Sequence, residues 1–208
     1  IATVITLVIA YPFAYALSRF GANTQRMMML LVMLPMWMNL LIRTYSWMNI
    51  LERNGIINNV LAGFGIEPLK MIGTPGAVIL GMVYNYLPYM ILPIYTVMSK
   101  LDITLLEAAD DLGANAFQRL RTLVIPLSMP GVISGITMVF VPSVSTFYIS
   151  QKLGGGTFEL IGDTIERQFV SSALNTGAAI SLVMMVLILI SLSIMNRFSD
   201  PEDGGIIV

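Results

Sequence analysis

A cluster of acidic side chains stands out in a chain of 208 residues that carries twelve acids in all. Four of the twelve, Asp102, Glu107, Asp110 and Asp111, lie in one short segment that also contains Gly113. Between these acids the residue types favour a helix, and the carboxylates would make part of its surface strongly polar. Because apolar sequence flanks the segment on both sides, we predict that this polar helix is a docking site for a soluble partner protein.

Catalytic chemistry has little support in the residue types. The sequence contains no His and no Cys, which removes disulfides, thiol chemistry and the usual zinc sites. The glycines at 154–156 favour a hinge over a phosphate loop, because no Lys-Ser/Thr pair follows them and no G-x-x-x-x-G-K-S/T pattern occurs. The net charge of −1 argues against a nucleic-acid partner. We predict that the chain is not an enzyme and holds no metal or cofactor of its own.

Cation binding by aromatic rings is a second kind of chemistry that the sequence offers. A cation over the face of a Trp or Tyr ring gains about 0.5–2 kcal/mol, depending on desolvation. The candidates for a cation pathway are Trp37, Trp47, Asn85, Tyr89 and Tyr148. A simpler interpretation stays open for Trp47 and Tyr45, which lie near a predicted membrane boundary where an aromatic belt is ordinary. Trp37 is predicted to lie deeper.

Membrane-spanning helices must position these residues. The chain is 56% hydrophobic and only 11% charged, with a mean hydropathy of +0.81, which is typical of a membrane protein. Charged residues are absent from several long runs, and a helix needs about 20 apolar residues to cross a bilayer. We predict an all-α, polytopic transmembrane helical bundle with five spans, at 1–18, 28–50, 75–98, 130–150 and 177–196.

Individual residues inside these spans indicate how the bundle works. Pro88 and Pro93 occur in one span, which favours a bent helix that lines a cavity. Hydroxyl-bearing residues follow Pro142 as far as Ser150. They favour an outer half of the fourth span that faces a water-lined pathway, and the alternative is that the hydroxyls form hydrogen bonds between helices. Arg43 lies within the second span, where a charge facing lipid is unfavourable, so we expect it to pair with an acid of another subunit.

The acidic segment is expected to form an amphipathic helix that begins at Asp102 or Thr104. Its predicted apolar stripe comprises Leu105, Leu106, Ala109, Leu112, Phe117 and Leu120. Gly113 within a helix costs about 1 kcal/mol relative to alanine, so it predicts a bend or a close approach of the backbone. A helix resting on lipid is the alternative, but acids outnumber bases in its first half and an anionic leaflet would repel them.

The acidic segment resembles the EAA loop of permease subunits in ABC-type importers. Glu107-Ala108-Ala109 is followed after three residues by Gly113 and after nine more by Leu123-Val-Ile-Pro126, with Leu and Ile exchanged relative to the family pattern. Residues 34–45, 125–131 and 147–150 also resemble the spermidine/putrescine permeases, most of all the PotB-type subunits. The resemblance implies the type I importer permease (MetI-like) fold, with a sixth, N-terminal span before residue 1. It also implies a loop at about 102–126 that couples to an ATPase through Glu107, Ala108, Ala109, Asp111, Gly113 and Phe117.

The resemblance further implies a function and a set of partners. A single permease domain, 1–208, would form a pathway for polyamines in the bacterial inner membrane. The implied partners are a second, PotC-like permease subunit, a PotA-like ATPase dimer that binds ATP and Mg²⁺, and an extracytoplasmic PotD-like polyamine-binding protein. With the acidic loop inside, six Lys and Arg residues lie inside and four outside, which agrees in sign with the positive-inside rule. Two alternatives stay open: the same machinery carrying ferric iron, thiamine or a phosphonate, and a channel or scaffold without ATP coupling.

Overall fold

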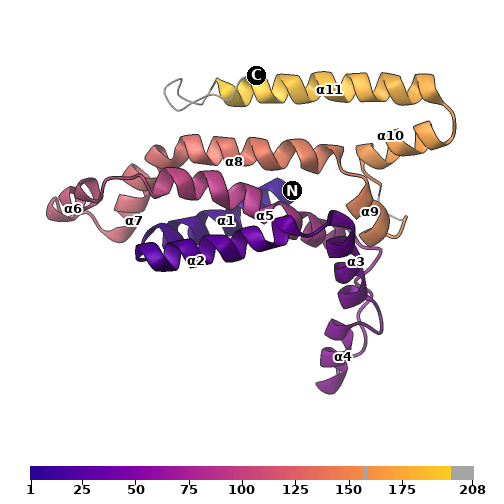
Figure 1. Ribbon diagram of the computed structural model, residues 1–208, viewed down its shortest axis with the longest axis horizontal. Helices are drawn as coiled ribbons and strands as arrows, with labels where there is room; N and C mark the ends of the chain where they lie inside the picture. The colour runs from indigo at the N-terminus through magenta and orange to yellow at the C-terminus, as the bar shows by residue number, and fades with distance from the viewer. Residues whose placement is uncertain (157–158, 198–208) are drawn as a thin grey trace.

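The structure, a computed structural model, describes residues 1–156 and 159–197. These residues form helices joined by turns, without a strand, so the all-α prediction is confirmed (Figure 1). The elements are α1 (Ala2–Ser18), α2 (Ala22–Met33), the 3-10 turn η1 (Leu34–Trp37), α3 (Leu40–Leu51), α4 (Ile56–Gly63), α5 (Pro75–Met98), α6 (Ile103–Asp111), α7 (Ala116–Arg119), the π-helical turn η2 (Leu120–Val124), α8 (Ile125–Ser145), α9 (Tyr148–Leu153), α10 (Ile161–Val170) and α11 (Leu174–Asn196).

Three helices in the described part of the chain are long and apolar enough to cross a membrane. They are α5, the helix 116–145 that contains α8, and α11. The apolar helix α1 is shorter, with 17 residues. The predicted spans at 1–18, 75–98 and 177–196 each coincide closely with one helix, because long charge-free runs mark such helices directly.

The prediction of one continuous helix over 28–50 is wrong. The chain bends after Trp37 and restarts as α3, with an angle of 94° between the two arms. Two local features explain the break. Pro35 lies in η1, and the Asn39 side-chain oxygen accepts a hydrogen bond of 2.8 Å from the Leu41 N–H, which caps α3. Apolar residues lie on both sides of the bend, so hydropathy does not reveal it.

The fourth predicted span is displaced along the chain. We predicted 130–150, whereas α8 ends at Ser145, and extended backbone at Thr146 separates it from α9. At its other end α8 follows directly on α7 and η2. Together they form one helix of 30 residues, Ala116–Ser145, and Pro126 lies within it just after the π-helical turn.

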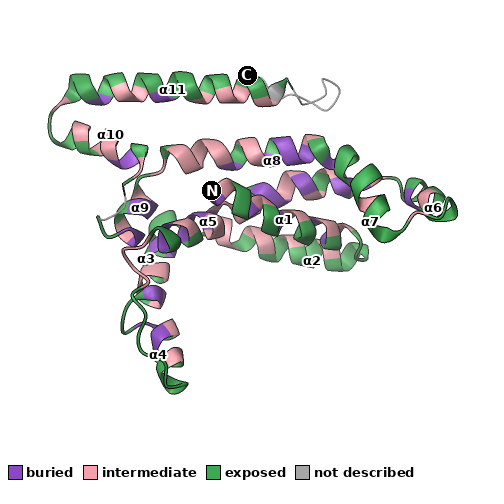
Figure 2. Ribbon diagram, turned by 180° about the vertical axis from the view of Figure 1, so that it is seen from behind, coloured by how far each residue is buried: buried purple, intermediate pink, exposed green. Residues whose placement is uncertain are grey.

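The centre of the bundle is α5, which packs against α1 and α8. Its buried side chains, including Met90, form the main core with residues of both neighbours (Figure 2). Two glycines of α8 allow a close approach to α5. A Cβ at Gly131 would lie 2.8 Å from the Pro93 carbonyl oxygen, and one at Gly135 would lie 2.8 Å from Met90 Sδ. They form a G-x-x-x-G pattern, which lets membrane helices pack backbone against backbone.

The two ends of the bundle carry different elements. Figure 1 shows α6 and α7 at one end, and α3, α9 and α10 at the other. From this second end α3 and α4 extend away from the bundle as an arm, while α11 runs alongside α8 (Figure 1). Most of the surface of α11 is exposed (Figure 2). The predicted docking segment and the aromatic residues of α3 and α9 therefore lie at opposite ends.

Candidate functional site

The acidic segment forms two short helices joined by a tight turn. The Asp102 carboxylate accepts a hydrogen bond of 3.0 Å from the Thr104 N–H and caps α6, as predicted for one of the two candidate residues. This bond lowers the pKa of Asp102, because it favours the charged carboxylate. Gly113 follows the helix with a φ of +79°, in the left-handed region that glycine tolerates best. The predicted bend is therefore confirmed.

A second cap and an ion pair fix α7 relative to α6. Asn115 and Gln118 form a capping box, in which each side chain accepts a hydrogen bond from the backbone N–H of the other, at 2.8 and 2.9 Å. Nη1 of Arg119 donates to both carboxylate oxygens of Asp110, at 2.8 and 2.6 Å. Because the pair is partly exposed, it adds little to global stability, but it joins α6 to α7 across the turn.

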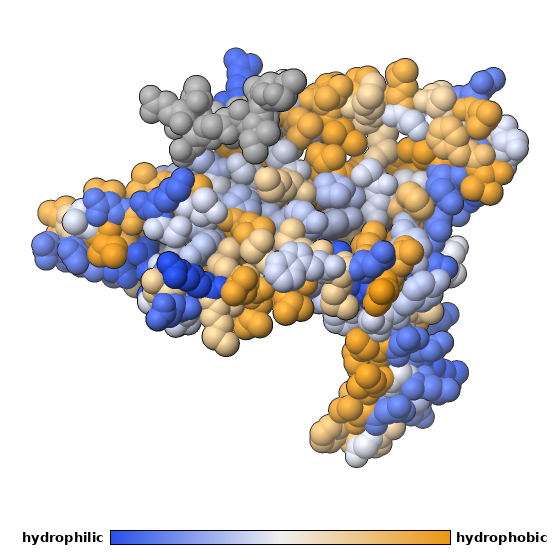
Figure 3. Space-filling view, viewed as in Figure 1, coloured by the Kyte–Doolittle hydropathy of each residue, from blue (hydrophilic) through white to orange (hydrophobic). Residues whose placement is uncertain are grey.

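Most of the predicted docking residues face outward. Glu107, Ala108, Asp111, Gly113 and Phe117 are exposed, and Ala109 is half-buried. The prediction of one apolar stripe along this segment is wrong: Leu106 is buried in the bundle core, whereas Leu105 and Leu112 are exposed. The turn at Gly113 divides the stripe. The α6–α7 end therefore mixes exposed apolar and charged side chains (Figure 3), a composition that suits burial against another protein.

Two of the predicted pathway residues lie in aromatic contacts at the opposite end. Trp47 of α3 meets Tyr84 of α5 edge to face, with ring centroids 5.2 Å apart. The ring of Tyr148, from α9, faces the Lys152 ammonium at 5.9 Å from its centroid. The same ammonium lies 5.4 Å from the ring centroid of Tyr45, from α3. The sequence indicated Tyr45 only as an aromatic-belt residue and gave no signal for Lys152 as a ring partner.

The other three predicted pathway residues lie elsewhere on the bundle. Trp37 is 75% exposed. The bend places it on a different helix from Trp47, whereas the predicted span over 28–50 contained both residues. Asn85 is 2% exposed, and its Nδ2 donates to the Gly81 carbonyl at 2.7 Å. Its Oδ1 has no hydrogen-bond partner within the described residues. Tyr89 lies one turn further along α5 and is 37% exposed.

Arg43 is a buried charge near the start of α3. It is 7% exposed, and neither its Nε nor its Nη1 has a hydrogen-bond partner in the described part of the chain. Leaving these two nitrogens of a buried guanidinium without acceptors is unfavourable, on the order of several kcal/mol. The expected pairing with an acid of another subunit stays a prediction.

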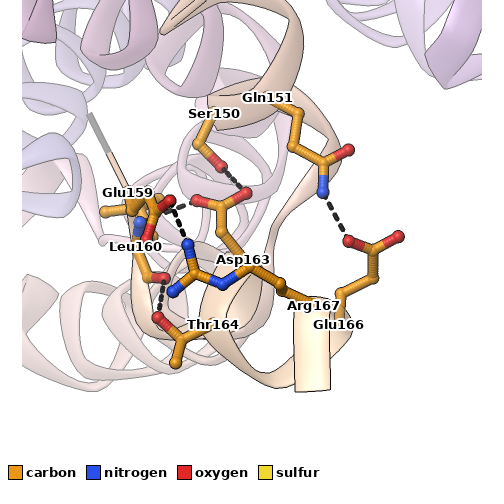
Figure 4. Close-up of polar contacts among 8 residues, drawn as sticks. All are labelled: Ser150, Gln151, Glu159, Leu160, Asp163, Thr164, Glu166 and Arg167. Atoms are coloured by element: carbon orange, nitrogen blue, oxygen red, sulfur yellow. Dashed lines mark hydrogen bonds and ion pairs between the residues drawn. The ribbon is translucent and has the colours of Figure 1, made fainter. Parts of the chain in front are cut away.

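A polar network joins α9 to α10 (Figure 4). The buried Asp163 carboxylate accepts hydrogen bonds from the Ser150 hydroxyl at 2.9 Å and from the Leu160 N–H at 2.7 Å. Helical periodicity alone does not indicate that Asp163 is buried, because a period does not reveal what packs against a helix. Figure 4 also shows two surface contacts, Gln151 with Glu166 and Arg167 with Glu159.

Known proteins resemble this chain over nearly its whole length. The family described as "Binding-protein-dependent transport system inner membrane component" matches residues 2–202. The spermidine/putrescine transport system permease protein PotB of Haemophilus influenzae is 42% identical over 200 residues, covering 95% of this chain and 70% of that protein. PotB of Escherichia coli is 39% identical over 202 residues, covering 96% and 74%. PotC of Shigella flexneri is 31% identical over 122 residues, covering 57% and 46%.

Solved structures share the fold. A bacterial ABC transporter involved in the import of the acidic polysaccharide alginate matches with a TM-score of 0.78 at 16% identity, over 98% of this chain and 77% of that chain. A structure of the alginate transporter in complex with its alginate pentasaccharide-bound periplasmic protein matches with a TM-score of 0.74 at 15% identity, over 95% and 74%. The importer-permease fold expected from the sequence is therefore confirmed.

Proposed function

Since the chain belongs to the family of inner membrane components of binding-protein-dependent transport systems, we propose that it forms the translocation pathway for polyamines in an ATP-driven importer. The proposal of a polyamine cargo rests on the identity of 39–42% to spermidine/putrescine permeases over 95–96% of this chain. The alginate transporters are only 15–16% identical to this chain, so their likeness supports the fold and does not indicate the cargo.

The α6–α7 end is the proposed contact with the ATPase. It presents Glu107, Ala108, Ala109, Asp111, Gly113 and Phe117, the residues that match the coupling loop in the sequence. Exposed Leu112 and Phe117 supply apolar area, and the nearby acids supply charge to recognise a basic partner surface. The Asp110–Arg119 pair keeps the two helices in one orientation. ATP and Mg²⁺ belong to that partner in this proposal, because the sequence carries no Walker pattern.

The cargo pathway is proposed to use aromatic faces in place of carboxylates. Helices α1, α5, α8 and α11 contain no acidic residue, so this subunit supplies no counter-charge from them. A polyamine ammonium can bind instead over Tyr or Trp rings. Among the candidates Trp37, Trp47, Asn85, Tyr89 and Tyr148, those on α3 and α9 lie near other aromatic rings, an arrangement that would favour a cation.

The proposed partners complete the importer. The likeness to PotC supports a related second permease subunit. In this proposal the two permease subunits pair with each other within the membrane. An acid of that subunit is the proposed partner of buried Arg43. A binding protein on the outer face delivers the cargo, and an ATPase dimer binds at the inner face. The chain lies in the bacterial inner membrane as a multi-pass protein.

ATPase activity of the reconstituted complex tests cargo and coupling together. With the binding protein present, we expect spermidine and putrescine to stimulate ATP hydrolysis and to enter the liposomes. Thiamine, ferric iron and a phosphonate should do neither. If one of these compounds stimulates hydrolysis instead, the chain is still an importer subunit, but its cargo is that compound and not a polyamine. Failure of any ATPase to co-purify would favour a channel or scaffold.

Two charge-reversal variants separate coupling from general damage. Glu107→Lys changes the proposed docking surface and should abolish uptake while the complex still inserts. Glu67→Lys makes the same change at an exposed position in the turn before α5 and should leave uptake intact. Uptake that is unaltered by Glu107→Lys would contradict docking through α6.

A further inference from the structure

Lys152 occupies an aromatic site with no charge partner. Its ammonium lies 5.4 Å from the ring centroid of Tyr45 and 5.9 Å from that of Tyr148, within the range of a cation–π contact to each ring. Within residues 1–156 and 159–197 it forms no ion pair, since the ion pairs there join Arg119 to Asp110 and Arg167 to Glu159.

The acids near Lys152 along the chain are already engaged with other groups. Asp163 accepts hydrogen bonds from Ser150 and Leu160, and Glu166 accepts one from Gln151. The close-up in Figure 4 shows these carboxylates turned toward their partners. The side chains of Tyr45 and Tyr148, rather than carboxylates, therefore hold the lysine in this conformation.

The two rings come from different elements. Tyr148 and Lys152 lie one turn apart on α9, whereas Tyr45 belongs to α3, beyond the 94° bend. The ammonium thus bridges α3 and α9. These two helices lie at the end of the bundle opposite α6 and α7 (Figure 1). A primary ammonium on a flexible alkyl chain has the same chemistry as the end of an aliphatic polyamine.

We propose that Tyr45 and Tyr148 form a binding site for an ammonium group of the cargo, and that Lys152 is a tethered competitor that fills this site until cargo displaces it. The proposal rests on the proposed polyamine function. Each exposed cation–π contact corresponds to a factor of about two to five in affinity. Competition and repulsion by Lys152 therefore raise the KM for polyamine uptake, so that half-maximal transport needs a higher polyamine concentration.

Removal of the lysine charge should lower the KM. Lys152→Met keeps the side-chain length, and we expect the KM for spermidine uptake to fall about three- to tenfold, with little change in the maximal rate. Lys152→Arg restores a cation and should return the KM toward the wild-type value. Lys70→Met removes a lysine that is exposed in the turn between α4 and α5 and should not change the KM. Tyr148→Leu should raise the KM, whereas Tyr148→Phe, which retains the ring, should raise it much less.

A chemical rescue keeps the test independent of folding. The sequence contains no cysteine, so Lys152→Cys gives this subunit one thiol. Any cysteines of the other subunits are first replaced with serine, so that this thiol alone is modified. The same preparation is divided and modified with either aminoethyl methanethiosulfonate, which restores an ammonium, or methyl methanethiosulfonate, which does not. We expect the ammonium-bearing sample to have the higher KM.

The outcomes separate this inference from the proposed function. Equal KM values for the two modified samples, with normal polyamine uptake by the wild-type complex, would overturn the competitor role alone. A lower KM in the ammonium-bearing sample would overturn it as well. If the wild-type complex takes up no polyamine, the proposed function fails, and the inference fails with it.

Discussion

At the scale of single residues, the left-handed turn at Gly113 decides how the docking surface is built. A Cβ there would meet no atom of this chain within 4 Å, so within the chain a substitution acts through the backbone. For an ordinary L-residue the left-handed region costs roughly 1–2 kcal/mol. We expect Gly113→Val to change the angle between α6 and α7 and to reduce binding-protein-stimulated ATPase activity at least tenfold, with membrane insertion unchanged.

The control for this residue is Gly113→Asn, because asparagine tolerates the left-handed conformation far better than valine. Its stimulated ATPase activity should lie close to that of the wild type. Equal losses in the two variants would show that side-chain bulk at the interface matters and that backbone conformation does not.

At the scale of elements, the contact between α5 and α8 depends on Gly131. A Cβ at this position would lie 2.8 Å from the Pro93 carbonyl oxygen, and backbone cannot move aside as the end of a flexible side chain can. We expect Gly131→Ala to destabilise the purified complex by about 1–3 kcal/mol, the range for overpacking a tight contact. Thermal unfolding in detergent measures the effect.

Gly76→Ala, in the first turn of α5, is the matched control. The nearest atom to its Cβ would be Thr74 Oγ1 at 3.8 Å, which is ordinary contact. Alanine also reduces the freedom of the unfolded chain, so this variant should be as stable as the wild type or more stable by about 0.4–1 kcal/mol. A lower melting temperature for Gly76→Ala than for Gly131→Ala would refute the close-packing account.

The sequence predicts some elements well and others poorly, for physical reasons. Long charge-free runs predicted α1, α5 and α11, because a bilayer imposes a length that apolar composition reveals. The break before α3 was missed, since Asn39 caps a helix within a stretch that is apolar on both sides. The docking residues were found through local spacing. The contact of Tyr45 with Lys152 was not found, because it joins α3 to α9 across the fold.

At the scale of the whole molecule, α11 is the candidate membrane span that is least buried within the described part of the chain. Large apolar residues on several sides of it are exposed, including Leu182, Val183 and Met185. An apolar cavity of about 660 Å³ lies between it and the α8–α10 region. A helix that is apolar all round is covered by lipid or by other helices. The second permease subunit of the proposed importer is the cover we expect.

Site-specific photocrosslinking tests this cover. Benzoylphenylalanine placed singly at positions 182–190 of α11 should crosslink to the second permease subunit in the intact complex. The yield should repeat with the helical period of 3.6 residues, because only one face meets the partner. The same group at Gly65, in the exposed turn after α4, should give no such product. If no position of α11 crosslinks to the second permease subunit, this surface of α11 faces lipid.

The unbroken helix Ala116–Ser145 has a mechanical consequence. Its 30 residues extend over about 45 Å at 1.5 Å per residue. One end is α7, which carries Phe117 on the docking surface, and the other adjoins Phe147 and the aromatic site on α9. If the helix tilts as one body by about 5° about one end, its other end moves by about 4 Å, which follows from its length alone. In the proposed importer, a rotation that the ATPase imposes on α7 is therefore transmitted along this helix to the end that adjoins α9, which carries Tyr148.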